Sequence, residues 1–281
     1  MTARVSAFSR RAKTTFAAFG FLSALAALPA HAAECGHDAE GFADFLSNIR
    51  QEAAAAGVSE SAIDAGLNGV TYNRSVISHD RGQKVFHQSF EEFSARMVNA
   101  FRLHKGAKLL SQNAEMFAKI EQQYGVPGPV LVAIWGLETD FGAYMGNFPT
   151  IESLATLAWD CRRSAEFRGE LIDALMLVQR GDIDPQTARG AWAGEIGQTQ
   201  FMPSSYLKFA VDFDGDGTRD LIHDKADVLA STANFLQHYG WQKGQSWGEG
   251  TANMEAIRAW NKSTVYSKTI AYFAEKLAEN H

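Results

Sequence analysis

The sequence contains few of the residues that mark a fibrous, low-complexity or nucleic-acid-binding chain. Only 6 prolines and 24 glycines occur in 281 residues, which excludes collagen-like and low-complexity designs. Lys and Arg (26) are fewer than Asp and Glu (32), so the formal net charge is −6. No nucleic-acid partner is expected, because phosphate binding needs clustered cations. Hydrophobic (46%) and charged (21%) residues instead occur in the proportions of a globular protein with a sizeable core.

Several catalytic motifs are also missing from the sequence. The eight histidines never show the HExxH spacing of a zinc metalloprotease, and no G-x-S-x-G nucleophile elbow occurs. No pairing of cysteine with histidine indicates a thiol protease, and there is no glycine-rich phosphate loop. These absences exclude the zincins and give no support to a serine or cysteine nucleophile.

The first 32 residues have the pattern of a secretory signal peptide. A basic start is followed by an apolar run from about residue 16 to 28 and by a small-x-small cleavage site, Ala30-His31-Ala32. The run is too short for a spanning helix, although an N-terminal membrane anchor is the alternative. We expect cleavage near residue 32, a periplasmic protein, and no membrane span after processing. Removal of Arg4, Arg10, Arg11 and Lys13 leaves 22 cations against 32 anions, a mature net charge of −10.

Export changes the interpretation of the two cysteines. In an oxidising compartment Cys35 and Cys161 could form one disulfide that ties the N-terminus to the body of the protein. One alternative is lipid attachment at Cys35, but the acidic Glu34 before it does not suit a lipobox. Two unpaired thiols are the other alternative. We predict the disulfide.

Hydrophobic periodicity predicts a mostly helical protein. Helical patterns occupy 38–66 and 88–124, whereas the polar stretch 69–81 between them is expected to be loop or extended chain. Strand signal is confined to short stretches near 192–202. A soft boundary near residue 115 separates a helical N-terminal region (33–115) from a core (116–281). Further helices are expected at 129–139, 152–160, 166–180, 204–210, 225–239, 253–260 and 265–278.

Glu138 lies at the end of the expected helix 129–139, which is apolar nearly all round. A carboxyl group in this position would be partly desolvated, which raises its pKa and lets it donate a proton near neutral pH. Glycosidic bond cleavage needs such an acid. The alternative is a solvated or ion-paired glutamate. Asp140 does not share a helix face with Glu138, so we expect a loop aspartate there.

Several runs of residues match one known family. Residues 124–160 read YGVPGPVLVAIWGLETDFGAYMGNFPTIESLATLAWD, and residues 190–217 read GAWAGEIGQTQFMPSSYLKFAVDFDGDG. Together with CRRSAEF, ANFLQHYGW and AWNKSTVY, these runs resemble the lytic murein transglycosylase B family, glycoside hydrolase family 103. The resemblance covers most of the mature chain and is clear from about residue 120 onward.

The resemblance implies a lysozyme-like core, and therefore a mainly α (α+β) fold with a small β element. It implies cleavage of the MurNAc–GlcNAc β-1,4 bond in peptidoglycan glycan strands without water, leaving a 1,6-anhydromuramoyl end. Glu138 would act first as general acid and then as base. Cell-wall synthesis proteins are possible partners. The alternatives are a muramidase that hydrolyses the same bond and a non-catalytic peptidoglycan-binding protein.

The resemblance also implies which residues contact substrate, although each of them could instead support the fold. The paired arginines would bind sugar or peptide carboxylate through bidentate hydrogen bonds. The remaining residues would line the cleft or hold the sugar. The full set is Gln198, Gln200, Phe201, Met202, Asn261, Tyr266, Arg162 and Arg163.

The sequence departs from the family pattern at two positions. Ala191 replaces a cleft serine, so a hydroxyl contact is missing. Glu195 stands where a small residue is expected, which adds a carboxylate close to the active-site motif. It could point to solvent, or it could face Glu138 and activate water, which would make the protein a hydrolase.

An acidic loop follows the spacing of an EF-hand. Asp212, Asp214, Asp216 and Asp220 occupy positions 1, 3, 5 and 9, and Thr218 would contribute its backbone carbonyl. Position 12 is His223, and alignment with the family motif gives the last carboxylate to Asp227, with Asp224 as rival. We expect a structural Ca²⁺ ion and no cofactor for the chemistry. The alternative is an acidic turn held by Arg219 and backbone amides.

Overall fold

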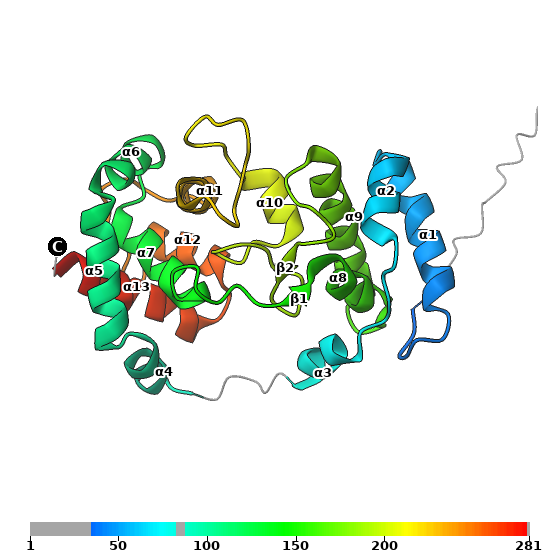
Figure 1. Ribbon diagram of the computed structural model, residues 1–281. Coiled ribbons are helices and arrows are strands. Elements are labelled where there is room, and N and C mark those ends of the chain that lie inside the picture. The colour runs from blue at the N-terminus through cyan, green and yellow to red at the C-terminus, as the bar shows by residue number, and fades with distance from the viewer. Residues whose placement is uncertain (1–34, 83–87, 280–281) are drawn as a thin grey trace, which may run out of the picture. The chain divides into compact units, whose positions relative to one another are not determined.

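The computed structural model describes residues 35–82 and 88–279, and most of them are helical (Figure 1). The expected signal peptide lies outside these residues. Within them, no helix combines the length and apolar character needed to cross a membrane. The mainly helical fold with a small β element is confirmed.

The first three helices are α1 (Phe42–Ala55), α2 (Glu60–Leu67) and α3 (Arg74–Gly82). The prediction of loop or extended chain over 69–81 is therefore wrong for α3. The Asn73 side chain accepts hydrogen bonds from the first backbone N–H groups of this helix and so starts it. The buried stripe of α3 is short and ends in an aspartate, Asp80. The segment is therefore mostly polar, and its composition did not indicate a helix.

The helical stretch expected over 88–124 is divided into α4 (Phe90–Met97), α5 (Ala100–Gln112) and α6 (Ala114–Tyr124). Asn99 caps α5 by accepting from the backbone N–H of Arg102 at 3.0 Å. Asparagine competes with the helical backbone for hydrogen bonds, so it favours helix ends over helix interiors. Hydrophobic spacing continues across these breaks, which explains why periodicity alone did not show them.

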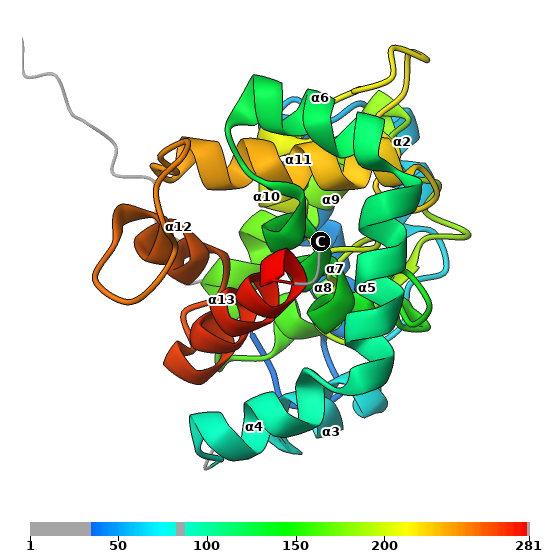
Figure 2. The ribbon, with the colours of Figure 1, turned by 90° about the vertical axis from the view of Figure 1, so that its left-hand side faces the viewer.

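Helix α7 (Gly128–Thr139) is deeply buried. It packs against α5, α6, α11 and α13 (Figure 2). All its residues except Pro129 and Glu138 are buried. The expectation of a helix surrounded by protein is confirmed, and Glu138 is the exception at its C-terminal end.

The remaining helices are α8 (Thr150–Trp159), α9 (Ser164–Arg180), α10 (Pro203–Phe209), α11 (Lys225–His238), α12 (Ala252–Trp260) and α13 (Thr264–Glu279). The strands β1 (Phe148–Pro149) and β2 (Arg189–Gly190) are antiparallel, with Phe148 opposite Gly190. The stretch expected to be extended, 192–202, contributes only isolated bridges, at Ile196 and Phe201.

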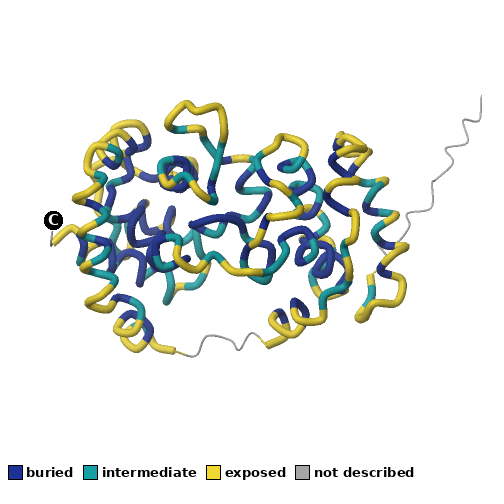
Figure 3. The backbone as a smooth tube through the Cα atoms, viewed as in Figure 1, coloured by how far each residue is buried: buried dark blue, intermediate teal, exposed yellow. Residues whose placement is uncertain are grey.

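Two hydrophobic clusters form the interior (Figure 3). One surrounds α7 and includes residues of α5, α6 and α10–α13. The other joins α1–α3 to α8 and α9. Both clusters combine residues from before and after residue 115, where the sequence suggests a soft boundary. The described residues group into one structural unit.

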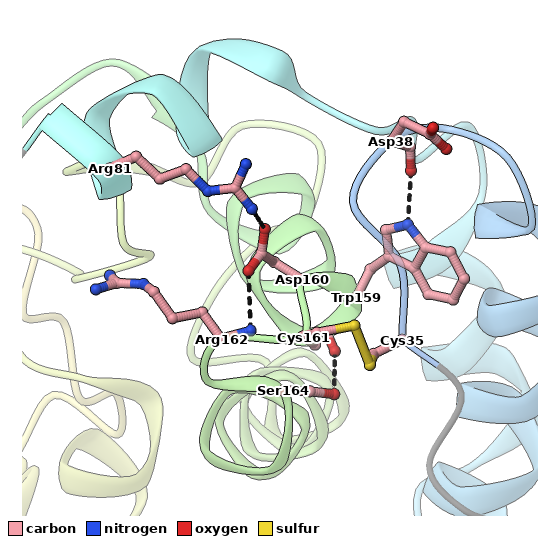
Figure 4. The surroundings of a disulfide bond; sticks show 9 residues. Cys35, Asp38, Arg81, Trp159, Asp160, Cys161, Arg162 and Ser164 are labelled. Carbon is pink, nitrogen blue, oxygen red and sulfur yellow. Dashed lines mark hydrogen bonds and ion pairs between the residues drawn. A yellow bond between two sulfur atoms is a disulfide. The ribbon is translucent and has the colours of Figure 1, made fainter.

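A disulfide joins Cys35 to Cys161 at the turn between α8 and α9 (Figure 4). Hydrogen bonds surround it: the Trp159 indole N–H donates to the Asp38 carbonyl at 2.6 Å, and Gly36 N–H donates to the Trp159 carbonyl at 2.9 Å. The N-terminal segment is thus fastened covalently and by hydrogen bonds to a turn 126 residues away.

Replacing both cysteines with serine should lower the free energy of unfolding by about 2–4 kcal/mol, because the unfolded chain regains the freedom that a long closed loop removes. Guanidinium chloride unfolding measures this change. Dithiothreitol should destabilise the parent by a similar amount and leave the double variant unchanged. Equal stability of parent and variant would contradict the prediction.

Candidate active site

The C-terminal end of α7 is held rigidly by its surroundings. Asp140 ends the helix in the left-handed conformation (φ 53°), and its carboxylate and carbonyl bind Arg102 and Lys105 of α5 at 3.2 and 3.0 Å. The Thr139 hydroxyl donates to the Gln198 carbonyl at 2.5 Å. These contacts fix the backbone that carries Glu138, and they give the loop aspartate Asp140 a structural role.

Glu138 has two hydrogen-bond donors. The Trp260 indole N–H, at the end of α12, donates to Glu138 Oε1 at 2.9 Å. The Tyr266 hydroxyl, in the first turn of α13, is the second donor. Tyr266 therefore contacts the acid itself, whereas the sequence suggests contact with the sugar.

Burial raises the pKa of Glu138 to about 7. The Trp260 and Tyr266 hydrogen bonds oppose this rise because they stabilise the carboxylate, and the negative charge of Glu195 adds to it. At neutral pH the group is thus present both as acid and as base. This agrees with the protonation behaviour expected for a carboxyl at the end of a buried helix.

Glu138 opens into a cavity of about 390 Å³. Four residues expected at the substrate site line this cavity with it: Gln200, Phe201, Met202 and Asn261. A larger hollow of about 1150 Å³ lies along α6 but contains none of these residues. The structure thus collects Glu138 and half of the expected substrate residues in one place.

Gln200 shows how the wall of the cavity is built. Its backbone is in the left-handed region (φ 58°), which a non-glycine residue adopts only when its surroundings enforce it. The side-chain nitrogen donates to the carbonyls of Met145 and Gly197 at 3.2 and 2.8 Å. The side-chain carbonyl oxygen is consequently the group that Gln200 can offer to a ligand.

Besides Tyr266, which reaches Glu138 itself, three of the expected substrate residues do not line the cavity. Gln198 is buried (8% exposed) and lies behind the wall, where it accepts from the Trp135 indole and donates to a backbone carbonyl, both at 2.9 Å. Arg162 and Arg163 both bind the carboxylate of Asp80, which is 2% exposed. These arginines therefore tie α3 to the start of α9.

Trp260 is a site residue that the sequence reasoning missed, although it directly precedes Asn261 in the motif AWNKSTVY. The signal was available, because indole is a donor without an acceptor and suits a carboxylate. Glu195 was singled out only as a departure from the family pattern. The structure places it on the wall of the same cavity as Glu138.

The acidic loop has a geometry that fits a divalent cation. Carboxylate oxygens of Asp212, Asp214 and Asp227 come within 4.8 Å of one another. Asp227 is buried, and burial raises its pKa. Oxygen ligands of this kind suit Ca²⁺.

The alternative, an acidic turn, is supported in part, because backbone N–H groups of the loop donate to the carboxylates of Asp212 and Asp227. Arg219 pairs with Asp182 and so does not hold the converging carboxylates. Asp224, the rival ligand, accepts from the first N–H groups of α11 as its N-cap. Asp227 remains as the helix carboxylate that closes the group.

Comparison with known proteins identifies the family of this chain. The family described as the transglycosylase SLT domain matches residues 41–251, and the chain belongs to this family. The crystal structure of SltB3 from Pseudomonas aeruginosa in complex with NAG-anhNAM-pentapeptide superposes with a TM-score of 0.81. It is 29% identical and covers 85% of this chain and 80% of that one.

Two further proteins similar to this chain are also lytic transglycosylases. Membrane-bound lytic murein transglycosylase B of Escherichia coli (strain K12) is 37% identical over 153 residues, which is 54% of this chain and 42% of that protein. The match thus spans less than half of this curated relative. Soluble lytic transglycosylase SltB1 from Pseudomonas aeruginosa is 25% identical, with a TM-score of 0.78 over 84% of this chain and 98% of that one.

Replacing Trp260 with phenylalanine should raise the pKa of Glu138 by about one unit, because a hydrogen bond that stabilises the carboxylate is lost while the ring packing is kept. Carbon NMR of the labelled glutamate carboxyl measures the titration. Trp247→Phe is the control, since that indole donates to the Ala271 carbonyl. A lowered or unchanged pKa would contradict the assignment.

Proposed function

We propose that this protein is a lytic transglycosylase that cleaves the MurNAc–GlcNAc β-1,4 bond of peptidoglycan. The observation that carries the proposal is the acid at the end of a buried helix, with a pKa of about 7 and two donors, in a cavity lined by Gln200 and Asn261. Family membership supports it. The related SltB3 was crystallised in complex with NAG-anhNAM-pentapeptide, and that ligand supports the same substrate class.

The chemistry needs one carboxyl group in two roles. Glu138 gives its proton to the glycosidic oxygen as the bond from that oxygen to the muramic anomeric carbon breaks, and GlcNAc leaves with a free hydroxyl. The muramic C6 hydroxyl then attacks the anomeric carbon and its proton returns to Glu138. The product is a 1,6-anhydro ring, no water is consumed, and the acid is regenerated.

The surroundings of Glu138 suit both halves of this reaction. Burial favours the protonated form that is needed first. After the proton has left, the Trp260 and Tyr266 donors stabilise the carboxylate that must act as base. Phe201 and Met202 give the cavity wall an apolar surface, and the Gln200 and Asn261 amides provide hydrogen bonds for sugar groups.

The cellular setting follows from the substrate. Peptidoglycan lies outside the cytoplasmic membrane, so we place the processed protein in the periplasm. The basic-apolar N-terminal pattern and the Cys35–Cys161 disulfide, which needs an oxidising compartment, support this location. Cell-wall synthesis proteins are the partners to test first.

A muramidase that hydrolyses the same bond is the second candidate function. Glu195 favours it, because a second carboxylate in the cavity could activate water in place of the C6 hydroxyl. The products separate the two functions, since a transglycosylase releases muropeptides one water lighter than those of a hydrolase. A non-catalytic binding protein would release neither.

We also propose that the acidic loop binds a structural Ca²⁺ ion. Asp212, Asp214, Asp216 and Asp227 would supply carboxylates and Thr218 its backbone carbonyl. The convergence of three of these carboxylates supports the proposal. The ion would stabilise the connection between α10 and α11, and it would have no part in bond cleavage.

Glu138→Gln should reduce turnover of purified sacculi at least about a thousandfold, because glutamine cannot donate the proton. Mass spectrometry of the soluble products measures turnover and shows whether the parent's products are anhydro or hydrated. Sacculus binding should survive, and Glu121→Gln, an exposed change on α6, is the matched control. Hydrated products alone would refute the transglycosylase assignment.

Saturating Ca²⁺ should raise the melting temperature by about 5 °C relative to chelator, because a ligand that binds only the folded state stabilises it. Mg²⁺ should not reproduce the rise. Asp214→Asn should abolish it, since a converging carboxylate is lost, whereas the exposed control Asp44→Asn on α1 should keep it. Differential scanning calorimetry decides, and an identical rise in Asp214→Asn would disprove the site.

A further inference from the structure

Glu195 is held in a rigid loop between β2 and α10. The flanking Gly194 and Gly197 have φ angles of 88° and 77°, where side chains are strained. Ile196 and Phe201 pair through two backbone hydrogen bonds of 2.8 and 2.9 Å. The backbone on both sides of Glu195 is therefore fixed, and this limits the positions that the Glu195 side chain can adopt.

Glu195 and Glu138 line the same cavity of about 390 Å³. Glu195 Oε2 accepts a hydrogen bond from the backbone N–H of Ala193 at 3.1 Å. This contact anchors one carboxylate oxygen. Two carboxyl groups that share a small, partly apolar cavity cannot both ionise without cost, because each charge raises the free energy of the other.

The surroundings differ for the two groups. Burial raises the pKa of Glu195 above its usual value. The backbone N–H of Ala193, which donates to its carboxylate, and the positive charge of Arg163, which also pairs with Asp80, oppose that rise. Burial opposes ionisation of Glu195 and of Glu138 alike.

No cation acts directly on Glu138 among the described groups that shift its pKa. Trp260 and Tyr266 are neutral donors, and the charge that acts on Glu138 is that of Glu195. The cation Arg102 of α5 acts on Tyr266. A cation thus favours ionisation of Glu195, while an anion disfavours ionisation of Glu138.

We propose that Glu195 is a positioning residue for the catalytic proton: it is the ionised carboxylate of the cleft, and its negative charge adds to burial in holding the proton on Glu138 near neutral pH. The inference rests on the proposed function, because it assigns Glu138 the role of general acid. Beyond the proposed function, it names Glu195 as the residue that increases the protonated fraction of Glu138 near neutral pH. Two carboxyl groups whose environments separate their proton affinities are the usual basis for such a division of roles.

Glu195→Gln is the central test, because the amide oxygen can still accept from the Ala193 N–H while the charge is lost. The alkaline limb of the pH profile of kcat/KM should shift to lower pH by about one unit. With a parental pKa of about 7, the rate at pH 7 should fall about fivefold, whereas the rate at pH 5 should change little.

Three further variants complete the experiment. Glu195→Asp keeps the charge and should keep the parental limb, and the exposed Glu121→Gln on α6 controls for net charge. Glu195→Ala, which also loses the Ala193 contact, should shift the limb like Glu195→Gln and serves if that variant does not fold.

An unchanged limb in the Gln and Ala variants would overturn the proposal. A loss of equal size at pH 5 and pH 7 would also overturn it, since that is the signature of a structural role. A failure of the proposed function would be detected in a different experiment. The parent would then release only hydrated products, or Glu138→Gln would still turn over sacculi. The pH limb reports the proton on Glu138 whether water or the C6 hydroxyl attacks.

Discussion

The burial of α7 is the constraint on which the rest of the site depends. A carboxyl group at the buried end of an apolar helix needs a fixed last turn. Removing its charge from water costs free energy, which would otherwise favour conformations that expose the turn to solvent. Asp140 provides that hold through its contacts with α5, and Thr139 through its bond to Gln198. The same burial that stabilises the core gives Glu138 its raised pKa.

The site is assembled from segments far apart in the sequence. The acid comes from the end of α7. The loop that carries Glu195 and Gln200 supplies part of the cavity wall, and the donors come from the end of α12 and the start of α13. The Trp260–Glu138 bond spans 122 positions. A rigid scaffold is needed to keep such groups in register, and the two hydrophobic clusters provide it.

Much of the fold could be predicted, and the errors have identifiable causes. Long amphipathic helices and the apolar helix α7 follow from periodicity, because their burial patterns are local properties. Helix α3 could not be predicted in this way, since the charge of its buried Asp80 is compensated by Arg162 and Arg163, which lie 82 and 83 positions further along the chain. Those arginines were expected at the substrate, and the structure pairs them with Asp80.

The sequence by itself determined that the protein is mainly helical, that an apolar helix carries Glu138 at its end, and that four aspartates follow an EF-hand spacing. Each of these is a matter of neighbouring residues. Only the tertiary structure decided that Trp260 and Tyr266 donate to the acid, and that Glu195 shares its cavity. The pKa of a buried group depends on desolvation and on charges brought close by folding, and no local pattern contains that information.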